Sequence, residues 1–251
     1  MTKKQINEFR FFLKDSIRQM IDFSLTDQSM GLQPPPLEKP YDKGYTLIKL
    51  PDFQSIIDKE TSLFEAINNR RSHRVFTKEP LKLDELSFLL YTTQGIQKVI
   101  NPAVALRTVP SAGCRHSFET YITAINVIGL DKGIYRYMPT KHSLLPIRLD
   151  ENIETSIIMG TLGQSFTGKA SVNFIWSTIP YRMEWRYGLA SHKVIAIDIG
   201  HVCQNLYLSA YAIHCGVCAI GAYDQLLMDK LIEVDGEEEF VIYIASLGKI
   251  K

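Results

Sequence analysis

The spacing of apolar residues changes along the chain between helical and extended patterns. Steps of three and four residues predict a long helix over about 194–214, marked by Ile199, Val202, Leu206, Ala210 and Ile213. Shorter helices are predicted at 62–69, 83–90, 152–162 and 225–232. Runs rich in β-branched residues predict strands at 120–127, 134–137, 172–178, 217–220 and 240–247. Helices and strands do not alternate strictly, which favours an α+β fold over a doubly wound sheet.

The first 60 residues follow another pattern. An amphipathic helix is predicted there from the spacing of Ile6, Phe9, Leu13, Ile17 and Met20. The Pro-rich stretch 33–40 should then be extended. We therefore expect a helix and extended arm over 1–60 and one main domain over 61–251.

Composition narrows the class of protein. Of 251 residues, 45% are hydrophobic and 22% charged, which excludes a disordered chain. The net charge of +1, from 28 basic and 27 acidic residues, disfavours nucleic acid as a partner. The longest apolar stretch is interrupted by Asp198 and His201, so no membrane span is expected. The N-terminus has no signal-peptide pattern, and we expect the protein to stay in the cytoplasm.

Several standard sites are absent or incomplete. No glycines stand two positions apart, which excludes the dinucleotide fingerprint GxGxxG. The segment 163–170 nearly matches a P-loop, but Ala170 replaces the metal-binding hydroxyl. Cys215 and Cys218 form a CxxC at the end of a predicted helix, the wrong end for a redox motif, and no second pair completes a zinc site. We expect small core residues there.

A polar stripe and a basic cluster remain. Asp198, His201 and Asn205 share a side of the long helix, where we expect a hydrogen-bonded network or a subunit contact. The densest basic cluster holds Arg70, Arg71, Ser72 and Arg74, whose guanidinium and hydroxyl groups could bind a phosphomonoester. Alone this is a weak indication, because basic runs are usually solvated.

Two turns of small residues would let a flat ligand approach the backbone closely. They are Pro110-Ser111-Ala112-Gly113 and Ile220-Gly221-Ala222. Lys249 follows the last predicted strand and could add a cation near a phosphate.

In this order the segments resemble the FMN-dependent nitroreductase superfamily, and within it the SagB-type dehydrogenases, also called thiazole/oxazole oxidase-like proteins. The resemblance covers roughly 60–251, and the Pro-rich arm is also similar. It rests on 70–76, 107–113, 119–121, 133–137, 185–188, 200–208, 219–222 and 248–249.

The resemblance implies a nitroreductase-like α+β fold. A central, mostly antiparallel sheet would be flanked by helices in an intertwined homodimer, with FMN at the interface. Arg70 and Ser72 would hold the phosphate beside Arg71, with Lys249 nearby, and Arg74 would face the pyrimidine edge. Pro110, Ser111, Ala112 and Gly113 of the other subunit would pack on the ring. Gly221 and Ala222, following Ile220, would offer backbone N–H groups near N5.

The implied activity is ping-pong electron transfer from NAD(P)H to a small acceptor such as a nitroaromatic or quinone. The alternative is a SagB-type dehydrogenase that oxidises peptide azolines to azoles, or a non-catalytic flavin-binding subunit of a peptide-modifying complex. Arg186 and Tyr187 stand where azoline oxidases of the family carry Lys-Tyr. A guanidinium is a poor base at neutral pH. Either Tyr187 handles the proton, or the chain does not oxidise azolines and the pair packs or binds an anion. Expected partners are a second copy and a small-molecule or peptide substrate.

Overall fold

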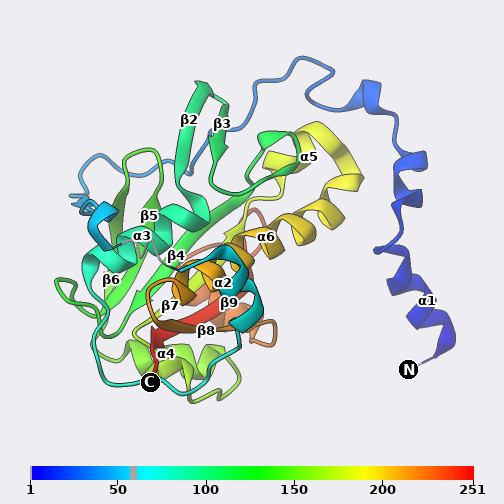
Figure 1. The fold of residues 1–251 in the computed structure, drawn as a ribbon. Helices are drawn as coiled ribbons and strands as arrows, with labels where there is room; N and C mark the ends of the chain where they lie inside the picture. The colour runs from blue at the N-terminus through cyan, green and yellow to red at the C-terminus, as the bar shows by residue number, and fades with distance from the viewer. Residues whose placement is uncertain (1, 57–60) are drawn as a thin grey trace.

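A seven-stranded sheet forms the centre of the domain in this computed structural model, which describes residues 2–56 and 61–251. The strand order is β1-β6-β5-β4-β7-β9-β8, and every neighbouring pair is antiparallel (Figure 1). The strands are β1 (Ile48–Lys49), β4 (Phe118–Ala124), β5 (Gly133–Met138), β6 (Ser143–Leu149), β7 (Val172–Thr178), β8 (Cys215–Ile220) and β9 (Phe240–Lys249). The α+β class with an antiparallel sheet is confirmed.

Helices cover both faces of the sheet because its central strands are apolar on both sides. Phe174 and Trp176 of β7 join the cluster under α3 (Leu83–Gln94) and α6 (Ser191–Tyr211). Ile175 points the other way, into the cluster with α4 (Ile153–Gly160) and α7 (Gln225–Leu231). Side chains alternate across a strand, so one continuous run supplies two cores.

Five helices and strands of the described chain were not anticipated from the sequence. They are the short strand β1, the hairpin of β2 (Ile96–Asn101) and β3 (Val104–Arg107), the strand β6, and the helix α5 (Tyr181–Tyr187). The predicted helix at 62–69 is present as α2 (Leu63–Asn69), which begins with a capping box between Ser62 and Glu65. The predicted strand at 172–178 coincides with β7.

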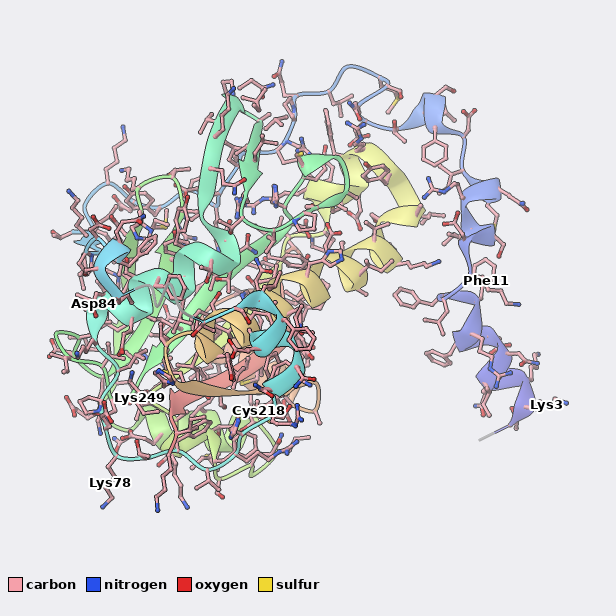
Figure 2. The ribbon with its side chains drawn as sticks, in the orientation of Figure 1. Lys3, Phe11, Lys78, Asp84, Cys218 and Lys249 are labelled. Atoms are coloured by element: carbon pink, nitrogen blue, oxygen red, sulfur yellow. The ribbon has the colours of Figure 1, made fainter. Side chains whose placement is uncertain are left out.

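The N-terminal helix is shorter than predicted. α1 (Lys3–Phe11) ends well before Met20, and a separate 3₁₀ turn follows at Asp15–Met20. Lys3 and Phe11 stand apart from the rest of the molecule (Figure 2), and Phe9 is 82% exposed. A helix gains most of its stability from packing an apolar face, and no residue of α1 is buried. The apolar spacing that continues to Met20 therefore does not produce a helix beyond Phe11.

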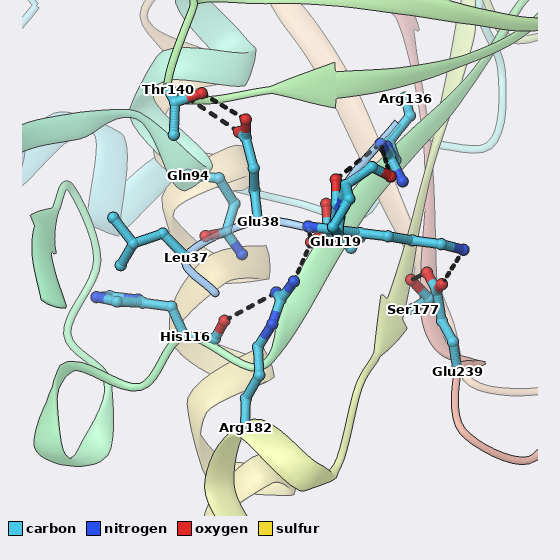
Figure 3. Close-up of polar contacts among 12 residues, drawn as sticks. Leu37, Glu38, Gln94, His116, Glu119, Arg136, Thr140, Ser177, Arg182 and Glu239 are labelled. Carbon is cyan, nitrogen blue, oxygen red and sulfur yellow. Dashed lines mark hydrogen bonds and ion pairs between the residues drawn. The ribbon is translucent and has the colours of Figure 1, made fainter. Parts of the chain in front are cut away.

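The Pro-rich segment is extended and bound to the domain by buried charged side chains. Arg107 donates to the Leu37 carbonyl at 2.7 Å, and Arg136 to that of Lys39 at 3.0 Å. The Lys39 amide donates in turn to the carboxylate of Glu119 at 2.7 Å. Figure 3 shows Arg182 reaching the same carboxylate, at 2.5 Å. The extended arm is thus held through its backbone. Its carbonyl groups form no helix or sheet hydrogen bonds of their own and are free to accept from the domain.

The remaining expectations concern membranes and cysteines. Among the described helices, none has the length and apolar character needed to cross a membrane. Cys215 begins β8 and Cys218 lies within it, and both are buried and free. Both are core residues, as predicted, but they lie in the strand and not in the turn before it.

Candidate functional site

The basic cluster lies along the edge strand of the sheet. After α2 ends, Ser72 forms a parallel bridge with Val217 of β8, and the His73 amide donates to the Val217 carbonyl at 2.8 Å. A Cβ on Gly216 would come within 2.7 Å of the Cβ of His73, so this close approach requires glycine. The segment 70–76 is thereby fixed beside β8.

Tyr207 of α6 connects this segment to the sheet. Its hydroxyl lies 2.9 Å from Ser72 Oγ and accepts a hydrogen bond from the Ala219 amide at 2.8 Å. The Arg70 guanidinium lies 5.1 Å from the centre of the Tyr207 ring, a cation–π contact. Sequence analysis did not identify Tyr207 as a site residue. Its only signal was its place in the 200–208 segment, where an aromatic at helical spacing resembles a core residue.

The arginines of the cluster differ in what they contact. Arg71 is directed back to its own turn, donating to the carbonyls of Asn68 and Arg70. The Arg74 guanidinium lies 6.0 Å from the Phe166 ring. Within residues 2–56 and 61–251, neither Arg70 nor Arg74 forms an ion pair with a carboxylate. Both positive charges are therefore open to an anionic ligand.

The end of β8 offers open backbone next to these charges. Ile220 is buried, but Gly221 and Ala222 are exposed. A Cβ built on Gly221 would meet no atom within 4 Å. The Ala222 carbonyl is anchored by the side-chain amide of Gln164 at 2.9 Å. We call Arg70, Ser72, Arg74, Tyr207 and Gly221 the β8 cluster.

Lys249 does not point to this cluster. Its side chain is buried, with the residue 8% exposed, and its ammonium pairs with the carboxylate of Glu85 on α3. Burial works against the charged form, but the Glu85 contact outweighs it and raises the pKa of Lys249. The charge is satisfied inside the domain, and the structure does not bring it to the arginines.

The 110–113 turn is held by α6. Asp198 accepts hydrogen bonds from the Ala112 amide, at 3.1 Å, and from the Ser111 side chain. Burial raises the pKa of Asp198, and these hydrogen bonds partly offset the rise. Asn205, on the same side of the helix, donates to the Thr92 and Thr108 carbonyls. The prediction of a hydrogen-bonded network is confirmed for Asp198 and Asn205.

Arg186 and Tyr187 lie against this turn. They end α5, and the Arg186 guanidinium lies 5.5 Å from the centre of the Tyr187 ring. Gly113 has a φ of 58°, and a Cβ there would stand 2.6 Å from the Tyr187 hydroxyl and 2.9 Å from Arg186 Nε. Only glycine fits without displacing them. We call Gly113, Arg186 and Tyr187 the α5 cluster.

The two clusters occupy opposite sides of α6. Asp198, which holds the 110–113 turn, and Tyr207, which holds Ser72, are nine residues apart. At 1.5 Å and 100° per residue, this separates them by roughly 13 Å along the axis and by half a turn. Within one chain, the two clusters therefore lie on different sides of α6. No group of described residues could bind a metal ion through three or more His, Cys, Asp or Glu side chains.

Comparison with known sequences places these segments in a family. The Nitroreductase family model matches residues 67–249. A curated protein of Methanocaldococcus jannaschii that carries a nitroreductase assignment is 29% identical over 202 residues. The match covers 80% of this chain and 96% of that relative.

Solved structures share the fold. One assigned as a nitroreductase, from Anabaena variabilis, superposes with a TM-score of 0.67 at 24% identity; the match covers 83% of this chain but only 42% of that longer one. Another, from Ralstonia eutropha, gives 0.66 at 23% identity and covers 88% of this chain and 96% of that one. A chain of the E. coli microcin synthetase complex, solved with a truncated pro-MccB17 bound, gives 0.61 at 16% identity over 98% of this chain and 94% of its own. At these identities the likeness shows the fold alone.

Proposed function

The chain belongs to the nitroreductase family, and we propose that it is an FMN-dependent oxidoreductase that transfers electrons from NAD(P)H to a small acceptor such as a nitroaromatic or quinone. The observation that carries this proposal is the β8 cluster. At one end it has a hydroxyl and guanidinium groups that pair with no carboxylate of the described residues, and at the other end it has open backbone.

These residues fit a flavin mononucleotide. Arg70 and Ser72 would hold its phosphate, since a guanidinium and a hydroxyl donate well to phosphate oxygens. Arg74 would place a positive charge at the pyrimidine edge, where negative charge accumulates on reduction. The exposed turn at Gly221 and Ala222 leaves room for the ring system. When bound, FMN supplies the two-electron redox chemistry that protein side chains lack.

We further propose that the active form is a homodimer. The α5 cluster would complete the flavin site of a second copy, because α6 separates it from the β8 cluster of its own chain. Exposed apolar side chains beside the long helix support such an interface. These are Leu63, Phe64 and Ile67 on α2 and Ile197 on α6.

A second candidate is azoline oxidation in a modified peptide. The likeness to a microcin synthetase chain over nearly the full length favours it. Arg186 opposes it, because a guanidinium does not accept a proton at neutral pH. Under this alternative Tyr187 would have to carry the proton. A non-catalytic flavin-binding subunit is the outcome if neither reaction occurs.

The test begins with the visible spectrum of the purified protein and identification of any released chromophore. The flavin absorption should be present, with FMN as the released species. NADPH or NADH added without oxygen should then bleach it. A colourless protein that does not take up FMN would contradict the proposal. Bound FMN that neither nucleotide reduces, but that a thiazoline peptide reduces, would establish the second candidate.

A further inference from the structure

The N-terminal arm forms one wall of a cleft at the α5 cluster. Residues 22–32, which we call the strap, lie beside α5 where the chain joins the body after α1 (Figure 1). The Gln28 amide donates to the Trp185 carbonyl at 2.9 Å, and Trp185 Nε1 donates to the Leu32 carbonyl at 3.1 Å. Tyr181 donates to Asp27 at 2.7 Å. These contacts fix the strap to the helix that ends in Arg186 and Tyr187.

The cleft between the arm and α5 is open to solvent and has a volume of about 360 Å³. Arg18, Phe23 and Gln28 line it from the arm, and Arg186 and Tyr187 from α5. Two hydroxyls of the strap also border it, but they brace the strap itself by donating to the Phe23 carbonyl. This volume suits part of a small molecule.

The lining is positively charged. It contains two guanidinium groups and, among the described residues, no carboxylate. Arg186 forms no ion pair within the described chain. Arg18 donates through Nε to Asp15 at 3.1 Å, a contact that leaves its terminal nitrogens out. Behind the cleft, burial lowers the pKa of Arg115, and the neighbouring charge of Arg186 lowers it further. Asp15 thus offsets part of the charge of Arg18, whereas the charge of Arg186 has no carboxylate partner in the described chain.

We propose that this cleft binds an anionic group, a carboxylate or phosphate, of the molecule on which the enzyme acts. Arg18 and Arg186 would hold the anion, with the Tyr187 hydroxyl as a further donor. The inference rests on the proposed function, because Tyr187 adjoins Gly113 of the turn assigned to the flavin of a second copy. An anion anchored here would leave the rest of the molecule directed toward that turn. The permanent charge of Arg186 serves this role better than a lysine that can lose its proton.

The experiment compares 4-nitrobenzoate with its uncharged analogue 4-nitrobenzamide as acceptors. In Arg18→Gln, KM for 4-nitrobenzoate should rise roughly three- to tenfold, the loss expected for one charge-assisted hydrogen bond in a partly exposed site. KM for 4-nitrobenzamide should stay within about twofold of wild type. Asp15→Asn should act in the opposite direction, because it removes the carboxylate next to Arg18. Arg10→Gln, an exposed arginine of α1 outside the cleft, is the matched control.

The same variants distinguish the source of the anion. A higher KM for NADPH with an unchanged KM for 4-nitrobenzoate assigns the cleft to a nucleotide phosphate, and the reverse assigns it to an acceptor carboxylate. Calorimetric titration of the full chain with each compound measures binding without turnover. If binding depends on Arg18 but the protein reduces no acceptor, the anion site is supported and the proposed oxidoreductase activity is refuted. If the enzyme is active but its affinities for NADPH and 4-nitrobenzoate do not change in the Arg18 and Asp15 variants, the anion site is refuted and the proposed function stands.

Discussion

Replacing Arg70 by alanine tests whether the β8 cluster binds the flavin phosphate. The Arg70 guanidinium is partly exposed, lies over the Tyr207 ring at 5.1 Å and has no ion-pair partner among the described residues. Its removal therefore leaves no carboxylate unpaired. The folded domain loses only the cation–π contact, about 0.5–1 kcal/mol at such a site. The thermal midpoint should change little.

The effect on flavin binding should be much larger. A hydrogen bond to a charged group contributes about 1.5–3 kcal/mol. At about 1.4 kcal/mol for each factor of ten, the Kd for FMN should rise roughly 10- to 150-fold. Arg70→Lys should fall between wild type and alanine, since an ammonium keeps the charge but not the two-pronged geometry.

The assay is a fluorescence titration of FMN with flavin-free protein. Lys98→Ala removes an exposed cation on β2, away from the β8 cluster, and controls for net charge. A Kd in Arg70→Ala equal to that of wild type would refute the phosphate assignment. An equal rise in Lys98→Ala would reduce it to a general charge effect.

Three further variants test the framework around the sites. Gly113→Ala should lower the free energy of unfolding by about 1–2 kcal/mol, the cost of a side chain at positive φ, and chemical denaturation measures it; no loss would contradict the fit against Tyr187. Arg182→Met should cost about 3–5 kcal/mol by the same measurement, because it leaves the buried Glu119 carboxylate without its main partner; a near-neutral result would show that the pair is dispensable. Burial and, second, the charge of Arg107 lower the pKa of His116 to about 3. As the pH falls, the unfolded chain therefore protonates this histidine before the folded chain does. The free energy of unfolding should fall below about pH 6.5, by up to about 1.4 kcal/mol per pH unit. His116→Asn should flatten that slope, and an unchanged slope would reject the assignment.

The strands predicted from the sequence were those whose apolar residues face two cores. β7 and β9 are continuous runs because helices cover both of their faces. β6 was missed because Pro146 interrupts it and its last residues are exposed. α5 was missed because its buried residues, Arg182, Met183 and Trp185, do not step by three or four, and one of them is charged.

The site was only partly predictable. The sequence shows which residues are neighbours in the chain, but not which distant segments pack together. Arg70, Ser72 and Arg74 could be grouped because they are neighbours in the chain. The contact of Tyr207 with Ser72 depends on how α6 lies on β8, across 135 residues. Lys249 was expected near the phosphate, but it pairs with Glu85, 164 residues away. The residues around Lys249 in the sequence do not predict this pair. The hydrogen bonds between the strap and α5 likewise join residues that lie about as far apart in the sequence.

We propose that the arginines at the end of α5 suit reduction of an anionic acceptor better than azoline oxidation. Azoline oxidation requires a side chain that accepts a proton from carbon. Arg186 and Arg115 lie near Tyr187, and neither accepts a proton at neutral pH. Glu184 of the same helix pairs with His192. The nearby carboxylate, Asp198, is already engaged in holding the 110–113 turn. Residues that donate hydrogen bonds and keep a fixed charge can position an anion and stabilise added negative charge, which is what transfer of electrons to a nitro group requires. Under the proposed function, Arg186 would hold an anion at the position where the azoline oxidases are expected to carry a proton-accepting lysine.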